Sequence, residues 1–307
     1  MAGFIRSTPM SKLLPIPTNL RRHEEGVDID LSWIDPEDLP EAFLSQSVAR
    51  QAPARVERLL VPRGFIGPVL PGPSPRLIFH TGRCGSSLIC QALKRDGLVF
   101  GEPEVFGQLL SPPLGSWRPE ELTALAHYLL SYFIAASPKG TVVKFSSWQV
   151  LFADLLIPAR APVAFLFREP TTVIESMLQR PPSWATAWLG DGRTPPSMRS
   201  RNLEPWQAAA LAITGFLEAG QGLQARGHPA FAYEALRPEG LSALQRHFEM
   251  PVRAVSDQDW TLDAKDPVRK RQYAPRPSAA LRQTANSSAF LEKAVSAYES
   301  LRRIESH

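Results

Sequence analysis

The residues best suited to chemistry in this chain follow a strongly apolar run, in the stretch from Thr81 to Ser87. Its two glycines predict a tight turn, and its two closing hydroxyl residues predict the start of a helix. Such a turn presents backbone N–H groups to an anion. We therefore expect an anion-binding loop, formed by Gly82, Arg83, Cys84, Gly85, Ser86 and Ser87.

This loop differs from the nucleoside-triphosphate motif G-x-x-x-x-G-K-[ST] in the position of its cation. Ser86 stands where that motif has lysine, and a cation, Arg83, lies inside the loop instead. The change suits a phosphate group less charged than a magnesium triphosphate. A phosphosulfate meets that condition.

Two more polar side chains end apolar runs of strand length. Glu102 closes the run 97–101, and Lys144 lies near the end of the run 141–145. Ligands of open parallel sheets bind beyond the carboxyl ends of the strands. We expect both side chains at the site. Partial desolvation at a strand end should also raise the pKa of Glu102, as suits a general base.

A fourth candidate group follows the apolar run 162–167. Arg168 comes directly after this run, Pro170 is placed to open a helix, and Ser176 lies eight positions after the arginine. Arg168 from the strand end and Ser176 from the helix face can therefore meet one anion together.

The elements that position these residues alternate between strand and helix. Helical spacing of apolar residues appears at 118–136, 206–226, 238–248 and 288–303, and a further strand is expected at 230–234. Such alternation predicts an α/β fold of three layers, with a mostly parallel central sheet. Residues 61–307 are assigned to this domain, and residues 1–60 to an N-terminal arm with a helix at 36–51.

Composition places the chain among globular proteins. Its 307 residues carry a net charge of +4, and no basic and aromatic stripe indicates nucleic-acid binding. Two cysteines exclude a disulfide framework, and no membrane-spanning apolar run or targeting segment is apparent. A cytoplasmic protein without a bound metal or membrane contact is expected. His80, beside the loop, is expected to pack in the core or at the strand end.

At this point the chain resembles the sulfotransferases that use 3′-phosphoadenosine 5′-phosphosulfate (PAPS), over about residues 76–275. Their 5′-phosphosulfate loop, [KR]-x-G-[ST]-[ST], is matched by residues 83–87. Their 3′-phosphate motif, Arg-x-Pro with a serine eight residues after the arginine, is matched by Arg168, Pro170 and Ser176. The stretch 233–236 is similar to their Tyr-Glu-Asp-Leu strand end.

The resemblance implies transfer of a sulfuryl group to a hydroxyl or amine of a small molecule, carbohydrate or peptide, with 3′,5′-adenosine bisphosphate as product. Arg83, Glu102 and Lys144 would be catalytic. Glu102 would be the base, because Ser146 stands where cytosolic members have a histidine. Glu104 is the nearest competitor of Glu102. The basic run 265–271 would supply cofactor contacts through Arg269 and Lys270, and the irregular segment 181–205 a lid.

Two other functions remain open from the sequence. One is a P-loop nucleotide kinase or nucleotide-binding regulator, in which Ser87 would hold magnesium. The other is a protein of the same fold that binds the nucleotide without turnover.

Overall fold

The computed structural model describes residues 12–53, 55–65, 72–94, 96–111, 114–185, 203–236, 240–252 and 289–304. At its centre is a parallel sheet of five strands in the order β5-β6-β4-β7-β8. The strands are β4 (Arg76–His80), β5 (Leu98–Gly101), β6 (Thr141–Lys144), β7 (Val163–Phe167) and β8 (Ala230–Ala232). The predicted α/β class with a parallel central sheet is confirmed.

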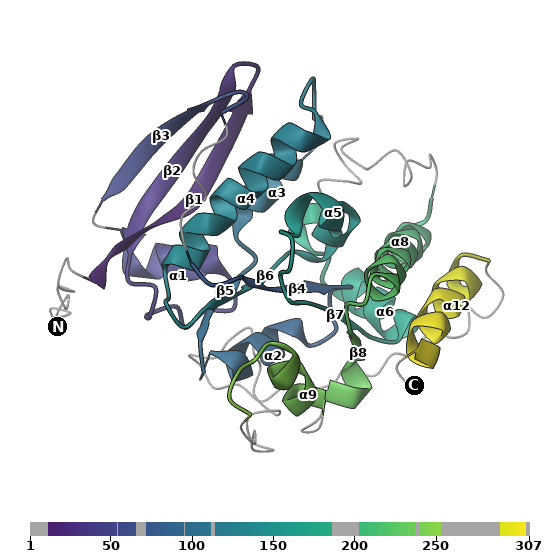
Figure 1. Ribbon diagram of the computed structural model, residues 1–307. Helices are drawn as coiled ribbons and strands as arrows, with labels where there is room; N and C mark the ends of the chain where they lie inside the picture. The colour runs from purple at the N-terminus through teal and green to yellow at the C-terminus, as the bar shows by residue number, and fades with distance from the viewer. Residues whose placement is uncertain are drawn as a thin grey trace, which may run out of the picture.

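Helices cover both faces of this sheet, which gives three layers (Figure 1). Successive strand residues point to opposite faces, so Ile78 packs in one apolar cluster while Leu77 packs in the other. One face carries α2 (Ser86–Leu93) and α9 (Leu241–His247). The elements of the second cluster include α3 (Glu104–Leu110), α4 (Pro119–Ala135), α5 (Ala153–Leu156), α6 (Pro170–Gln179), α8 (Pro205–Ala225) and α12 (Ala289–Ile304).

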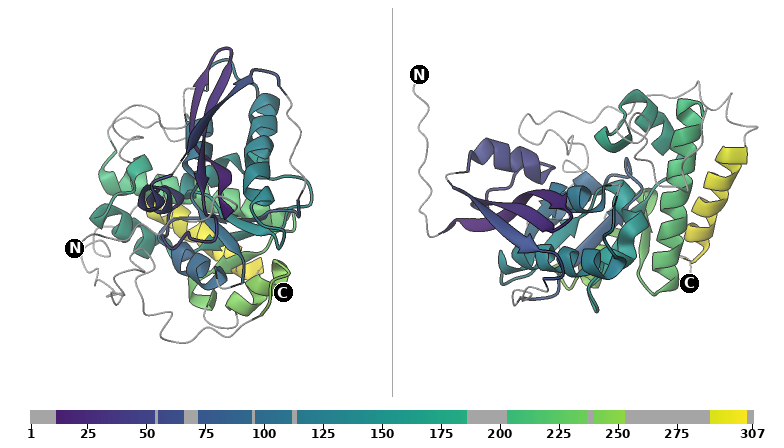
Figure 2. Two further views of the ribbon diagram at one scale, coloured as in Figure 1. Left: turned by 90° about the vertical axis from the view of Figure 1, so that its left-hand side faces the viewer. Right: turned by 90° about the horizontal axis from the view of Figure 1, so that it is seen from above.

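The helices expected from apolar spacing are present. In α4 the residues at helical spacing, Leu122, Leu125, Leu129 and Phe133, are all buried, and Pro119 occupies the first helical position. The long helix α8 packs against α12, which runs beside it (Figure 2). Short 3₁₀ turns follow β6 at Ser147–Phe152 and β8 at Tyr233–Ala235.

The N-terminal region forms a second sheet that the sequence prediction did not include. Strands β1 (Leu14–His23), β2 (Gly26–Ile34) and β3 (Val56–Pro62) pair antiparallel in that order. The alternation of apolar and polar residues in β2 was the available signal. The expected boundary at residue 60 lies inside β3, and the expected helix 36–51 is helical only at α1 (Leu44–Gln51).

This second sheet is bound to the main domain by side-chain hydrogen bonds. On α3, Gln108 accepts from the backbone N–H of Leu20 at 2.6 Å and donates to Asn19 at 2.8 Å. At the end of β3, Arg63 donates twice to the Glu121 carboxylate of α4, at 3.1 and 2.9 Å.

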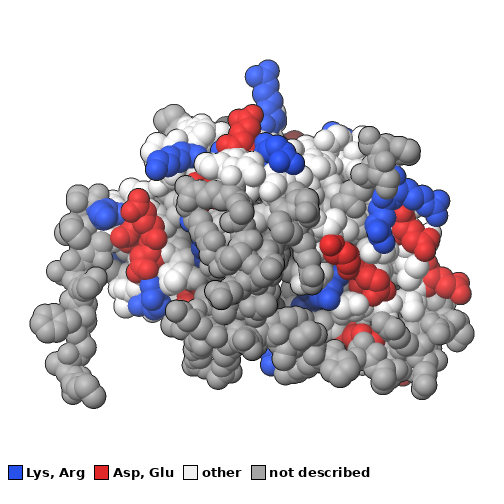
Figure 3. All heavy atoms as spheres, turned by 90° about the horizontal axis from the view of Figure 1, so that it is seen from below, with Lys and Arg blue, Asp and Glu red and all other residues white. Residues whose placement is uncertain are grey.

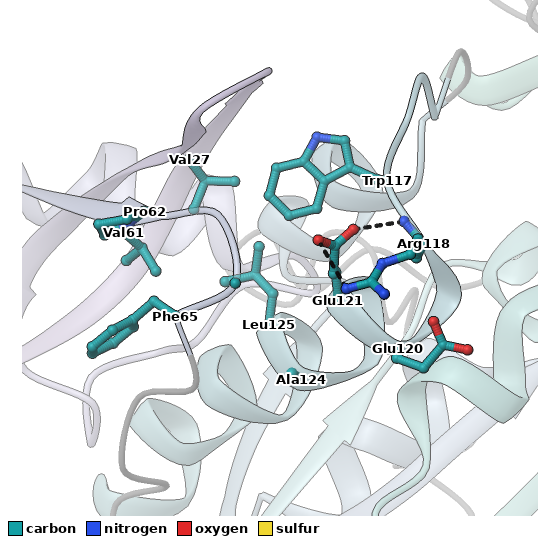
Figure 4. A pocket seen from close by; sticks show the side chains of 11 residues that line it. Val27, Val61, Pro62, Phe65, Trp117, Arg118, Glu120, Glu121, Ala124 and Leu125 are labelled. Atoms are coloured by element: carbon teal, nitrogen blue, oxygen red, sulfur yellow. Dashed lines mark hydrogen bonds and ion pairs between the residues drawn. The ribbon is translucent and has the colours of Figure 1, made fainter.

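A pocket of about 130 Å³ lies between the second sheet and α4 (Figure 4). Its lining is apolar apart from Arg118, Glu120 and Glu121, and Glu121 is already paired with Arg63. None of the predicted site residues lines it. The pocket therefore belongs to the packing of the second sheet against α4 and not to the candidate site.

Candidate active site at the strand ends

The anion loop joins β4 to α2 and has an unusual backbone. Gly82, Arg83 and Gly85 all have positive φ, at 80°, 52° and 75°. Successive residues in such conformations turn their N–H groups toward one side and form an anion-binding concavity. A side chain at Gly85 would also meet the Tyr233 ring, since its Cβ would lie 2.4 Å from a ring carbon. Glycine is therefore required at this position for both conformation and space.

The side chains of the loop are divided between core and surface. Cys84 is fully buried in the cluster beneath α2, and this burial raises the pKa of its thiol. Its contribution to an anion is therefore limited to its backbone. The Arg83 guanidinium contacts the backbone carbonyl of Arg180, at the end of α6. Ser86 and Ser87 are buried at the first turn of α2.

Glu102 and Lys144 meet at the ends of the adjacent strands β5 and β6. The Lys144 Nζ lies 2.7 Å from Glu102 Oε1 and 3.4 Å from the Ser87 hydroxyl oxygen. Lys144 is fully buried, whereas the Glu102 side chain is 21% exposed. Ser146 donates a hydrogen bond of 2.7 Å to the second carboxylate oxygen. One buried cation thus connects the anion loop with a partly exposed carboxylate.

The expected rise in the pKa of Glu102 is wrong. Burial does oppose its ionisation, but the charge of Lys144 and the hydrogen bonds from Lys144 and Ser146 outweigh burial and lower the pKa to about 2. For Lys144, burial disfavours the charged form, and Glu102 outweighs that effect and raises the pKa. Both groups are therefore charged at neutral pH.

The backbone of Glu102 is strained, with a positive φ of 47° in a residue that has a side chain. Strain of this kind persists only where the surrounding structure holds it, and it is common at functional sites. Here the Glu102 N–H donates to the Lys144 carbonyl at 2.7 Å, and Pro103, the N-cap of α3, follows immediately.

A segment from the N-terminal region forms one wall of this site. The Phe43 ring centroid lies 5.3 Å from Lys144 Nζ, and the Ala42 carbonyl would lie 2.1 Å from a Cβ on Gly101. Lys94, which directly follows α2, holds the segment by donating to the carbonyls of Leu39 and Glu41 at 2.5 and 2.6 Å. No sequence pattern pointed to Phe43, because only the packing of the second sheet brings it here.

The structure places Arg168 beside the loop. Its guanidinium carbon lies 4.4 Å from the centre of the Tyr233 ring, and its Nη1 lies 3.4 Å from the Arg83 carbonyl oxygen. Among the described residues, Ser176 lies partly exposed on α6, and its side chain does not hydrogen-bond to Arg168. Tyr233, the first residue of the stretch 233–236 noted in the sequence, follows β8 and packs against Arg168.

His80 takes a more specific position than core packing alone requires. The imidazole is 4% exposed, accepts a hydrogen bond from the Gly82 N–H at Nδ1, and lies near Glu102. Arg269, Lys270 and residues 186–202 of the expected lid lie outside the described residues.

Acidic and basic side chains are interspersed on the described part of the lower face in Figure 3. Within the described ranges, no helix is long and apolar enough to cross a membrane, and no group of three or more His, Cys, Asp or Glu residues is arranged to hold a metal ion.

Comparison with known proteins gave matches among solved structures alone. No family model and no curated protein matches the chain. A sulfotransferase domain from the curacin biosynthetic pathway is 16% identical, with a TM-score of 0.46, over 76% of this chain and 99% of that one. Sulfotransferase STF9 from Mycobacterium avium is 11% identical, with a TM-score of 0.38, over 78% of this chain and 76% of that one.

Proposed function

We propose that this protein is a sulfotransferase that moves a sulfuryl group from PAPS to a hydroxyl or amine of a small molecule, carbohydrate or peptide. The observation that carries the proposal is the position of Lys144. Its ammonium group reaches both Ser87 of the anion loop and the Glu102 carboxylate. Transfer of an anionic group to a protonated acceptor needs these two functions side by side.

The residues present fit the nucleotide donor. The loop from Gly82 to Ser87, with its left-handed turns and the start of α2, suits the 5′-phosphosulfate. Arg168 beside the loop and Ser176 on α6 would hold the 3′-phosphate, and Arg269 with Lys270 would add cations. When bound, PAPS supplies the sulfuryl group on a phosphate leaving group.

Charge stabilisation in this proposal comes from the loop N–H groups, Arg83 and Lys144. Donors that are already oriented toward developing negative charge are each worth ~10²–10³-fold in rate. Lys144 is held in place by Glu102 and Ser87 and needs no rearrangement. The Arg83 guanidinium also contacts the Arg180 carbonyl through Nη2.

Glu102 would accept the proton of the acceptor. A carboxylate with a pKa of about 2 is a weak base toward a free hydroxyl. The hydroxyl becomes far more acidic once its oxygen bonds to sulfur, and the proton can then pass to an ionised carboxylate. The low pKa thus keeps Glu102 ready to accept, while Ser146 and Lys144 fix its two oxygens.

Thermal unfolding with different nucleotides tests the proposal against its alternatives. We expect 3′,5′-adenosine bisphosphate to raise the Tm by several degrees, and ATP with magnesium to raise it much less. An equal or larger effect of ATP with magnesium would favour a nucleotide kinase. If the protein binds the bisphosphate but neither releases sulfate from PAPS nor transfers it to an acceptor, it is a binding protein without turnover.

A further inference from the structure

His80 lies between the anion loop and the catalytic ion pair. It ends β4, the central strand of the sheet, with β6 on one side and β7 on the other. Its imidazole is 4% exposed. This buried imidazole contacts both functional parts of the site, although the proposed mechanism assigns it no role.

The hydrogen bond from Gly82 determines the protonation of this imidazole. A backbone N–H can only donate, and the Gly82 nitrogen lies 2.8 Å from His80 Nδ1. Nδ1 must therefore carry a lone pair, and the proton of the neutral ring is on Nε2. A doubly protonated ring could not accept this bond.

The other nitrogen is close to the carboxylate. His80 Nε2 lies 3.8 Å from Glu102 Oε1. This distance is too long for a direct hydrogen bond, but in a buried site the dipole of an N–H group still interacts with a carboxylate. Because Lys144 already balances the charge of Glu102, a neutral imidazole leaves the group of three without net charge.

We propose that His80 is a positioning residue that, as the Nε2-protonated neutral imidazole, holds Gly82 in the left-handed turn of the anion loop and supports the ionised Glu102. His80 thereby stabilises both the anion loop and the base. The role in turnover depends on the proposed function, whereas the link between His80 and Gly82 does not.

Nitrogen NMR of the wild-type protein labelled with ¹⁵N-histidine tests the link directly. At neutral pH we expect the His80 signals of an imidazole with a bare Nδ1 and a protonated Nε2, assigned by their absence in His80→Asn. A proton on Nδ1, or on both nitrogens, would overturn the proposal. This measurement needs no nucleotide and no acceptor.

Two substitutions separate the two nitrogens. In His80→Asn the amide oxygen can replace Nδ1 as the acceptor for Gly82, while nothing replaces Nε2. In His80→Gln the amide nitrogen can replace Nε2, while the acceptor for Gly82 is lost. We expect His80→Asn to bind 3′,5′-adenosine bisphosphate within about twofold of wild type, and His80→Gln to bind it about 3- to 10-fold more weakly, as the loss of one hydrogen bond allows.

Turnover, measured as sulfate release from PAPS, should fall about 10-fold in His80→Asn despite its intact binding, since the base loses one of its supports. His127→Asn, which removes a half-buried imidazole on α4, is the control and should change neither quantity. Equal losses of binding in the two His80 variants, or none in either, would contradict the proposal. If the wild type itself fails to bind the bisphosphate, the proposed function fails, and the NMR result still decides the link to Gly82.

Discussion

The ammonium group of Lys144 lies 2.7 Å from a carboxylate oxygen of Glu102, although the two residues are 42 positions apart in the chain. They meet because β5 and β6 are parallel neighbours, with Gly101 in register with Lys144. This contact explains why the carboxylate is ionised at a site where burial alone would have favoured its neutral form. It also links the stability of the site to its proposed chemistry.

Replacing Glu102 by glutamine should abolish most turnover. The amide keeps the shape of the side chain but cannot accept a proton, so we expect the rate of sulfuryl transfer to fall by ~10²–10⁴. Bisphosphate affinity should change little, because the loop is intact. Glu104→Gln is the matched control, since Glu104 is exposed on the first turn of α3 and should retain wild-type turnover. Near-normal turnover in Glu102→Gln would exclude this carboxylate as the base.

The two charges should depend on each other for stability. Glu102→Gln and Lys144→Met are each expected to lower the free energy of unfolding by about 3–5 kcal/mol, because each leaves the other charge without its partner. The destabilisation of the double variant should be smaller than the sum of the two single destabilisations by about 2 kcal/mol or more. The exposed pair of Arg50 and Asp38, at 2.6 Å, is the control and should show a coupling near zero. Additive effects at residues 102 and 144 would mean that the pair is not formed in solution.

Acid should remove the contribution of Glu102 to the stability of the fold. Its pKa is lowered from 4.5 to about 2 on folding, so its contribution is complete above about pH 4.5 and is lost as the pH falls toward 2. The Tm difference between wild type and Glu102→Gln should therefore shrink between about pH 5 and about pH 3. Glu121 titrates in the same window, but it is present in both proteins and cancels in the difference. A difference that does not change with pH would show that the pKa is not lowered.

Arg168 and Ser176 should distinguish two nucleotides. If they hold the 3′-phosphate, Arg168→Ala should weaken bisphosphate binding by ~10–100-fold and Ser176→Ala by ~3–10-fold. Binding of adenosine 5′-monophosphate should weaken much less in both variants. Calorimetric titration of both nucleotides gives the comparison. Arg226→Ala, which breaks an exposed ion pair with Asp154, is the control. Equal losses for both nucleotides would assign the two residues another role.

Gly85 should tolerate no side chain. Alanine would be strained by the positive φ of 75° and would also press against the Tyr233 ring, so both Tm and bisphosphate affinity should fall. Gly227→Ala separates the two causes, since Gly227 has a φ of 86° but nothing within 4 Å of a new Cβ. We expect Gly85→Ala to lower the Tm more than Gly227→Ala does. Adding Tyr233→Ala to Gly85→Ala should restore part of that Tm. Equal losses at both glycines would show that the ring can move away.

The sequence alone determined the main elements and the position of each candidate along them. Apolar runs and helical spacing predicted the parallel sheet and the helices α4, α8, α9 and α12, because burial against the core requires those periods. Glycine and hydroxyl residues indicated the anion loop. The strand-end rule selected Glu102, Lys144 and Arg168, since parallel strands end at one edge of a sheet.

Only the tertiary structure decided how these residues act on one another. Strand order brought Lys144 within reach of both Ser87 and Glu102, and this contact reversed the expected pKa shift. Packing of the second sheet brought Phe43 to the site. The electrostatic effect of a charge falls steeply with distance and depends on burial, and neither distance nor burial between strands far apart in the chain is encoded in local sequence patterns.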